Sequence, residues 1–354
     1  RSADPGADCL YASGCSCLAF CCFMPPLHSL SFEFRPYRRP FRQTLKTSHG
    51  VWKYREGIIL RLCDESGRIG FGEVAPLPWF GTETQTQALA FCQHLPGTLS
   101  ANNVFSVMPT LPACKFGLEV ALNNLSGDRH CKELEPACYS ALLPAGRAAL
   151  SAWSPLWAMG HRTFKWKIGV APVAVELDWL AQLMEQLPLG AKLRLDANGG
   201  RDELTAHHWL DQCDRLGHRI EFIEQPLPPA RFEGLVKLDH RYRTAIAIDE
   251  SVTTLEQLKA HYFRGWRGIY VGKAAIIGSP SRLKQFCHDH PIDVVISSVF
   301  ETDIGRQALI DLADELNDIL PHSPRRVLGM GTQQWLPNDG LDDPDWEALW
   351  QRLA

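Results

Sequence analysis

Leu193-Arg194-Leu195-Asp196 is a short, mostly apolar run that ends on a carboxylate, and the pattern recurs along the chain. Five charged residues each stand at or just past the end of such a run. They follow one another at intervals of 29, 28, 25 and 24 residues: Lys167, Asp196, Glu224, Asp249 and Lys273. Successive strands of a β/α barrel place residues at one shared mouth in this way. The series therefore predicts a barrel with five charged groups around one site.

Apolar stretches at helical spacing separate these runs. The stretch from Val173 to Leu187 carries one apolar stripe and is closed by Pro188 and Gly190. Besides 193–196, strands are predicted at 163–168, 220–224, 245–249, 268–272 and 294–298. Alternating strands and helices imply a parallel sheet with right-handed crossovers. A doubly wound sheet is the alternative, but it would gather its ligands at one switch point, so the even series favours the barrel.

The chain before the barrel shows the alternation of a small antiparallel sheet. Strands are predicted at 31–35, 57–62 and 69–73, with a helix within 82–95. We expect an α+β domain at 24–115, the barrel at 116–327, and a C-terminal segment at 328–354 that packs back on the first domain. The Lys46–Val51 segment has turn chemistry and little to bury, so it is a candidate mobile loop.

The composition is that of an ordinary soluble globular protein. The chain has 354 residues, of which 45% are hydrophobic and 21% charged, with a net charge of −4. Nothing in this balance calls for nucleic acid or an anionic membrane as a partner. No apolar run approaches the roughly 20 residues that span a bilayer. Seven scattered cysteines predict buried thiols in a reducing compartment, so we expect a cytoplasmic protein.

Residues 1–23 are interpreted as a leader or as a sequence foreign to the fold. Five of the 12 cysteines fall there, but no paired C-x-x-C framework supports a metal or disulfide knot. The apolar stretch from Cys17 to Met24 is too short and poorly flanked for a signal sequence. A plastid transit peptide is a further alternative, with weak support because basic residues are nearly absent. Met24 is the expected start of the native fold.

The three acids of the series each terminate a predicted strand: Asp196, Glu224 and Asp249. Singly, such an acid is more often a helix N-cap or a strand-end ion pair. Three converging carboxylates would shift one another's pKa, and a hard divalent cation relieves that repulsion. Mg²⁺ suits oxygen ligands and leaves positions open for a substrate, with Mn²⁺ as a substitute. Glu250, next to Asp249, is a further acid that supports or competes with these ligands.

Lys165-Trp166-Lys167 lies in a predicted strand, where alternate side chains share a face. Both ammonium groups would point into the barrel, and Trp166 would point outward toward the helices. Lys273 would lie across the barrel from Lys167. One lysine can then take a proton while the other supplies positive charge, which indicates a proton-transfer enzyme. The alternative is that these are exposed lysines on an edge strand or the barrel rim.

Ser297-Ser298-Val299-Phe300-Glu301-Thr302 ends the next predicted strand. Its hydroxyls and backbone N–H groups would hold a substrate carboxylate. Ordinary helix capping by Ser or Thr is the alternative. Ser298 stands 25 residues after Lys273, so the motif continues the spacing of the series.

These motifs resemble the enolase superfamily, and within it the o-succinylbenzoate synthases, most of all the cyanobacterial ones. The matching pieces span the barrel and continue into the first domain: Lys165-x-Lys167, Arg194-Leu195-Asp196-Ala197-Asn198, Glu224-Gln225-Pro226-Leu227, Ile248-Asp249-Glu250-Ser251, Lys273, Ser297-Ser298-x-Phe300-Glu301-Thr302, Arg55-Glu56-Gly57 and Gly72-Glu73-Val74-Ala75-Pro76-Leu77-Pro78. As a set they are highly specific for the superfamily and less specific for one activity.

The resemblance implies an N-terminal α+β capping domain over a modified (β/α)7β barrel of the TIM type. It implies Mg²⁺ on Asp196, Glu224 and Asp249. It also implies a lyase that dehydrates 2-succinyl-6-hydroxy-2,4-cyclohexadiene-1-carboxylate to o-succinylbenzoate, a step toward menaquinone or phylloquinone. The partner is then a small dicarboxylate substrate, and both a monomer and a homodimer remain open.

The resemblance further implies a role for each site residue. Lys167 would abstract the proton alpha to the carboxylate and then, as an ammonium, protonate the departing hydroxyl, while Mg²⁺ stabilises the enediolate. Lys165 would help orient the carboxylate. Lys273 would stabilise the enediolate from the other face, through a cation–π contact with the substrate ring. Substrate binding and its support would come from five residues: Arg194, Asn198, Ser297, Ser298 and Thr302.

Two other functions stay open beside the synthase. Racemisation of N-acylamino acids, especially N-succinylamino acids, would use the same metal with both lysines as opposed bases. The Ser297–Thr302 motif favours the synthase, as does the absence directly after residue 296 of the Asp-x-Asp expected in dipeptide epimerases. A non-catalytic barrel that serves as a binding or scaffold protein is the third class, and the complete series argues against it.

Overall fold

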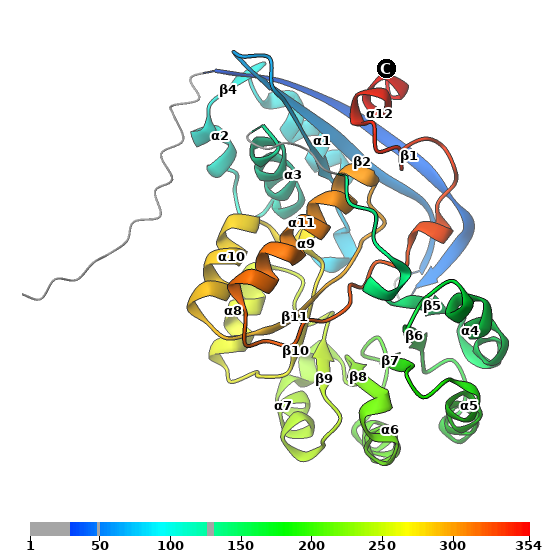
Figure 1. Cartoon of the computed structure of the whole chain (residues 1–354). Helices are drawn as coiled ribbons and strands as arrows, with labels where there is room; N and C mark the ends of the chain where they lie inside the picture. The colour runs from blue at the N-terminus through cyan, green and yellow to red at the C-terminus, as the bar shows by residue number, and fades with distance from the viewer. Residues whose placement is uncertain (1–28, 48–49, 126–130) are drawn as a thin grey trace, which may run out of the picture.

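The structure is a computed structural model that describes residues 29–47, 50–125 and 131–354. In these residues a four-stranded antiparallel sheet lies beside a seven-stranded parallel sheet, and helices surround the parallel one (Figure 1). The expected leader at 1–23, with its five cysteines, lies outside the described residues, as do Ser48 and His49 of the expected mobile loop.

The antiparallel sheet has the strand order β3-β2-β1-β4, from β1 (Leu30–Thr47), β2 (Gly50–Asp64), β3 (Ile69–Val74) and β4 (Thr98–Leu99). Strands β1 and β2 form one long hairpin that is irregular between Pro40 and Leu45. The pairing resumes with Leu45 opposite Trp52 and continues to Thr47 opposite Gly50, so it reaches into the expected loop. Three helices accompany this sheet: α1 (Gln85–His94), α2 (Ala101–Phe105) and α3 (Pro112–Asn123).

The parallel sheet runs in chain order from β5 to β11. Its strands are β5 (Ala141–Leu143), β6 (Thr163–Lys167), β7 (Lys192–Asp196), β8 (Ile220–Glu224), β9 (Ile246–Ile248), β10 (Ile269–Gly272) and β11 (Asp293–Ile296). The connecting helices are α4 (Ala149–Ala158), α5 (Val173–Gln186), α6 (Glu203–Leu216), α7 (Phe232–Arg241), α8 (Leu255–Phe263), α9 (Ala274–Ile277) and α10 (Pro280–Asp289), and α11 (Asp303–Ile319) follows β11. The order confirms the predicted barrel and excludes the doubly wound sheet, in which the strand order reverses.

A two-residue segment takes the place of an eighth strand. Leu328 pairs with Tyr139 before β5, and Gly329 pairs with Ser297 after β11, each in an isolated parallel bridge. The N–H of Leu328 donates to the carbonyl of Cys138 at 2.9 Å, and that of Gly329 donates to the carbonyl of Ile296 at 2.8 Å. These bonds close the (β/α)7β barrel, so the fold class predicted from the sequence is confirmed.

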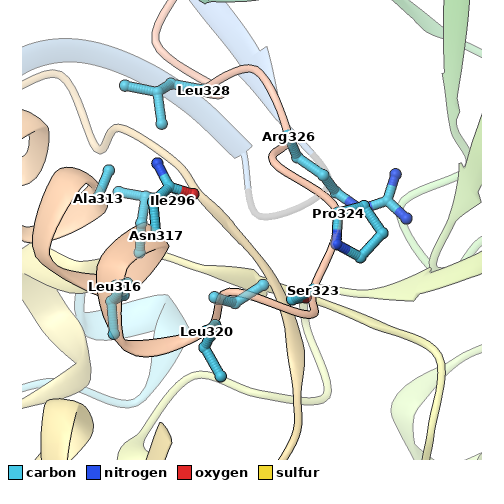
Figure 2. A pocket seen from close by; sticks show the side chains of 10 residues that line it. Ile296, Ala313, Leu316, Asn317, Leu320, Ser323, Pro324, Arg326 and Leu328 are labelled. Carbon is cyan, nitrogen blue, oxygen red and sulfur yellow. The ribbon is translucent and has the colours of Figure 1, made fainter. Parts of the chain in front are cut away.

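The segment that leads to this closure leaves a small gap against β11 and α11. Figure 2 shows Leu316 and Leu320 on one side of the gap and Pro324 and Arg326 on the other. Its volume of about 20 Å³ has room for roughly one water molecule. We therefore interpret it as a packing gap and not as a ligand site.

The C-terminal segment packs on the antiparallel sheet through α12 (Trp346–Arg352), the red helix beside the blue strands in Figure 1. The rings of Trp346 and Trp350 lie 6.3 and 6.0 Å from that of Phe71. Arg39 of β1 is buried and binds Asp339 at 2.7 Å and Asp342 at 2.9 Å.

Helix α3 touches both units of the fold. It packs on β3 of the antiparallel sheet and on α9 and α10 of the barrel. Because the expected boundary at 115/116 falls within this helix, that boundary stays a prediction, as does the one at 327/328.

The cysteines correct one expectation. Four of the scattered cysteines are buried, but Cys63 is only partly buried, and Cys131 and Cys138 are exposed. The two exposed thiols lie in the irregular segment before β5, which runs over the surface. Among the described helices, none is both long enough and apolar enough to cross a membrane.

Candidate active site

The charged residues of the series meet at the carboxyl ends of the barrel strands. In the parallel ladders Lys167 lies opposite Asp196, and Asp196 lies opposite Glu224. Alternate residues of a strand share a face, so this register keeps all three on the inner side. A cavity of about 520 Å³ opens there, and it is lined by residues of both units.

Lys165 bridges two of the three acids. Its Nζ lies 2.8 Å from Asp196 and 2.8 Å from Glu224. Burial disfavours the charge on Lys165, but the attraction of Asp196, Glu224 and Asp249 outweighs it and raises the pKa of this ammonium. Burial and then the charge of Asp196 raise the pKa of Glu224 to about 8.

The other two lysines of the series differ in their surroundings. Lys273 is ion-paired with Asp249, and its Nζ lies 4.3 Å from the centre of the Phe80 ring. The side chain of Lys167 lines the cavity and makes no hydrogen bond or ion pair with any residue that the structure describes. Trp166, between Lys165 and Lys167, points outward onto Trp209 of α6, as predicted.

The three acids form a donor set that fits a hard divalent cation. Asp196, Glu224 and Asp249 are buried to 8%, 1% and 5% exposure and offer only oxygen. Among the described residues they are not preassembled as a ligand cluster, because Lys165 lies between two of them and Lys273 holds the third. Burial, and then the negative charge of Asp196, raises the pKa of Glu224, and a cation bound there would favour its ionised form.

Two amide side chains, those of Gln225 and Asn198, hold these acids in place. The sequence had not revealed the role of Gln225 and had left that of Asn198 open. The side-chain oxygen of Gln225 accepts from the N–H groups of Asp249 and Ser251 at 3.0 and 3.2 Å. The N–H of Asn198 donates to Asp196 at 3.0 Å, and its side chain donates to Glu250 at 3.1 Å. Both amides have left-handed backbones, with φ of +40° and +46°. The available signal was an amide residue one or two positions after a strand-end acid.

Glu250 also lines the cavity. Burial and then the charge of Asp249 raise its pKa to about 7. One of its carboxylate oxygens is buried without a hydrogen-bond partner among the described residues.

The two serines after β11 differ in how many hydrogen-bonding positions of their hydroxyls remain unused. Ser298 donates to Glu301 at 2.5 Å and accepts from the N–H of Phe300 at 3.0 Å and from the hydroxyl of Thr332 at 2.9 Å. One donor and two acceptor positions are then used. Ser297 makes only a 3.3 Å bond to the carbonyl of Gly329. Both line the cavity, but only Ser297 keeps capacity for a ligand.

Two residues predicted to bind the substrate or to support its binding, Arg194 and Thr302, do not line the cavity, and their roles stay predictions. Arg194 is buried one layer deeper than Asp196 on the same face of β7, where it binds Glu221 at 2.8 Å. Thr302 is fully buried at the start of α11, where its N–H and hydroxyl donate to Glu73 at 2.9 and 2.5 Å. Thr302 stands at the N-cap position of α11, but its side chain makes no capping hydrogen bond to that helix.

Arg194→Ala is expected to destabilise the fold by about 3 kcal/mol, because it breaks a buried ion pair on the barrel floor. Glu221 keeps its 3.0 Å contact with Arg326, but the other side of its carboxylate loses its partner. Urea unfolding measures the change, with Lys192→Ala as an exposed control within about 0.5 kcal/mol of the parent. Equal stability of Arg194→Ala and the parent would contradict the network.

An aromatic roof that the sequence did not reveal covers part of the cavity. Phe41 and Trp52 of the hairpin contact Phe300 edge to face, with ring centres 5.1 and 5.3 Å apart. Trp79 lies 4.9 Å from Trp52. These rings come from both units, and no spacing pattern in the sequence connects them.

Comparison with known families supports the resemblance. Residues 149–320 match the family model described as "Enolase C-terminal domain-like", and residues 32–125 match "MenC, N-terminal domain". The o-succinylbenzoate synthase of Thermosynechococcus vestitus is 39% identical over 328 residues, which cover 92% of this chain and 99% of that protein. That of Pasteurella multocida is 29% identical over 320 residues, 85% of this chain and 88% of the relative.

Solved structures of related proteins have the same fold. The crystal structure of o-succinylbenzoate synthase from Thermosynechococcus elongatus BP-1, complexed with Mg in the active site, has a TM-score of 0.83 and 38% identity, and the match covers 91% of this chain and 99% of that one. The L-Ala-D/L-Glu epimerase of Bacillus subtilis has a TM-score of 0.70 at 20% identity, over 87% of this chain and 91% of that one. The second likeness shows a shared fold only.

Proposed function

Because this chain belongs to the o-succinylbenzoate synthase family of the enolase superfamily, we propose that it dehydrates 2-succinyl-6-hydroxy-2,4-cyclohexadiene-1-carboxylate to o-succinylbenzoate. One observation carries the proposal: the Lys167 side chain, with no ion-pair partner among the described residues, faces a cavity that Asp196, Asp249 and Lys273 also line. The third strand-end acid, Glu224, is buried and contacts the cavity residue Lys165 at 2.8 Å. A base, a set of oxygen ligands and a second cation are what removal of a proton alpha to a carboxylate requires.

Lys167 takes the proton in the proposed reaction and later returns it. As a neutral amine it removes the proton alpha to the carboxylate, and the C–H electron pair enters the conjugated carboxylate. The resulting enediolate then expels the ring hydroxyl, which leaves as water after Lys167 protonates it. The ring becomes aromatic and Lys167 is neutral again. With no ion pair to any described residue, this amine needs no partner to be displaced before it acts.

Lys273 and Lys165 stay charged in this scheme. Lys273 stabilises the enediolate from the face opposite Lys167. Lys165, held by Asp196 and Glu224, adds positive charge next to the substrate carboxylate. Charges that are already oriented in a buried site stabilise a developing anion better than water does.

We further propose Mg²⁺, with Mn²⁺ as a substitute, as the cation bound by Asp196, Glu224 and Asp249. When bound, the cation supplies the positive charge that offsets a second negative charge on the substrate carboxylate. The Mg in the active site of the related Thermosynechococcus structure supports this choice. The positions of Asn198 and Gln225 support it too, because both amides fix the acids that would be ligands.

The succinyl end of the substrate is assigned to Ser297 rather than Ser298. Ser297→Ala is expected to raise KM by about three- to tenfold with little change in kcat, because one hydrogen bond to the substrate is lost. Ser298→Ala is expected to lower stability by about 1–3 kcal/mol, because it leaves buried partners of its hydroxyl unsatisfied. Steady-state kinetics and urea unfolding of both variants check the pair, and the reverse pattern would reverse the assignment.

One enzyme preparation given two substrates tests the function itself. Loss of the cyclohexadiene absorbance is compared with deuterium exchange into N-succinylamino acids. We expect fast dehydration. Fast exchange with negligible dehydration would make the racemase the better assignment, since both activities use the same acids and lysines.

The proposed setting is the cytoplasm, with a small dicarboxylate as the partner and neither nucleic acid nor a membrane involved. The product would feed menaquinone or phylloquinone synthesis. For the chain itself we propose a capping domain at 24–115, a barrel at 116–327 and a returning segment at 328–354, acting as a monomer or homodimer.

A further inference from the structure

Phe80 belongs to the antiparallel unit, yet its ring lies against the lysine that ends barrel strand β10. The ammonium of Lys273 is 4.3 Å from the ring centre. A cation within about 6 Å of a ring face is attracted by the negative charge of that face, and more strongly where water is excluded. The Lys273 side chain is only 14% exposed, and both residues line the cavity.

A hydrogen bond and a left-handed glycine fix the conformation of the turn that carries Phe80. It forms the short 3-10 helix η1 (Pro78–Phe80), in which the N–H of Phe80 donates to the carbonyl of Leu77 at 2.8 Å. Gly81 closes the turn in a left-handed conformation, with φ of +85°. A Cβ at Gly81 would lie 3.4 Å from the hydroxyl of Thr253, so the turn abuts the loop that follows β9.

Helix α3 ties this turn to Lys273. Glu83, just past the turn, accepts from the N–H groups of Ala113 and Cys114 at the start of α3, at 3.2 and 2.7 Å. Helix α3 packs on α9, which begins directly after Lys273. The ring and the lysine are therefore anchored to the same helix.

We propose that Phe80 is a positioning residue that holds the Lys273 ammonium at the cavity wall opposite Lys167. Among the described residues, Asp249 is the only carboxylate ion-paired with Lys273, and it is also one of the three acids assigned to the metal. A bound cation would compete with Lys273 for the same oxygens. The Phe80 ring binds no metal, so it keeps its attraction for the ammonium when the acid is shared. This inference rests on the proposed function.

Replacements at Phe80 separate the ring's charge distribution from its volume. Phe80→Leu keeps an apolar side chain but removes the negative ring face, and we expect kcat to fall about five- to thirtyfold. KM and the Mg²⁺ dependence should stay within about twofold. Phe80→Tyr keeps the face and should retain at least about half of kcat. Trp79→Leu is the control, because Trp79 lines the same cavity while the cation–π contact of Lys273 is with Phe80, so its effect should fall on KM.

Three results would overturn the assignment: an unchanged kcat in Phe80→Leu, an equal loss in Phe80→Tyr, or a loss confined to KM. Phe80→Met is the second apolar replacement if the leucine variant does not fold. If the parent enzyme exchanges deuterium into N-succinylamino acids without dehydrating the cyclohexadiene, the proposed function fails. The same variants measured by exchange then still test Phe80, because Lys273 is one of the two bases in that reaction.

Discussion

Lys167→Ala is expected to lower kcat for dehydration by about a thousandfold or more while the fold and metal binding stay intact. A positioned acid or base contributes about 10²- to 10⁴-fold, and Lys167 is assigned both steps. The remaining lysines cannot substitute for it. Lys165 is held by Asp196 and Glu224, and Lys273 is paired with Asp249 after β10, four strands from the β6 strand of Lys167.

Loss of the cyclohexadiene absorbance measures the Lys167→Ala effect, while Mg²⁺ titration and thermal unfolding verify that the site survives. Lys192→Ala, an exposed lysine at the opposite end of β7, is the control for loss of one positive charge and should keep the parent's kcat. Appreciable turnover by the purified Lys167→Ala protein would remove Lys167 as the base.

Asp249→Ala is expected to abolish Mg²⁺-dependent activity and to weaken Mg²⁺ binding by more than about a hundredfold. Groups that only support a ligand already change metal affinity by about 10- to 100-fold, so losing one of three ligands should exceed that. The same change removes the ion-pair partner of Lys273. Weaker Mg²⁺ binding and the loss of the Lys273 partner would both reduce the stabilisation of the anion that forms in the reaction.

Calorimetric titration with Mg²⁺ measures the Asp249→Ala effect directly. Glu250→Gln is the matched control, because Glu250 is the next residue and faces the same cavity without being assigned to the metal. Its Mg²⁺ affinity should stay within about fivefold of the parent. Unchanged affinity in Asp249→Ala would exclude Asp249 from the ligand set.

The barrel and its charged mouth were predictable because strand periodicity and chain spacing act together. Parallel strands end at the same edge of the sheet. An acid or lysine at the end of one strand therefore lies near those at the ends of the adjacent strands, on the inner face of the barrel. Strands β6 to β11 were predicted within a few residues of their bounds. Strand β5 was missed, because its three residues are followed by Pro144 and show no periodicity.

The rest of the site depends on depth and on contacts between distant parts of the chain, which spacing does not encode. Arg194 and Asp196 share a face of β7, and only the three-dimensional structure separates the floor of the barrel from its mouth. Thr302 is held by Glu73, which lies 229 residues earlier in the chain. Phe80 reaches Lys273 from η1, the turn that follows β3, and nothing in the local sequence indicates this contact.

The returning C-terminal segment has a consequence for synthesis on the ribosome. Chains generally fold from the N-terminal side as they emerge. Here the first sheet keeps Phe71 uncovered until Trp346 and Trp350 have been made, and the barrel stays open until Leu328 and Gly329 have been made. The antiparallel sheet is translated before the barrel and is nevertheless among the last parts to be completed, and a stalled chain would expose apolar surface to chaperones.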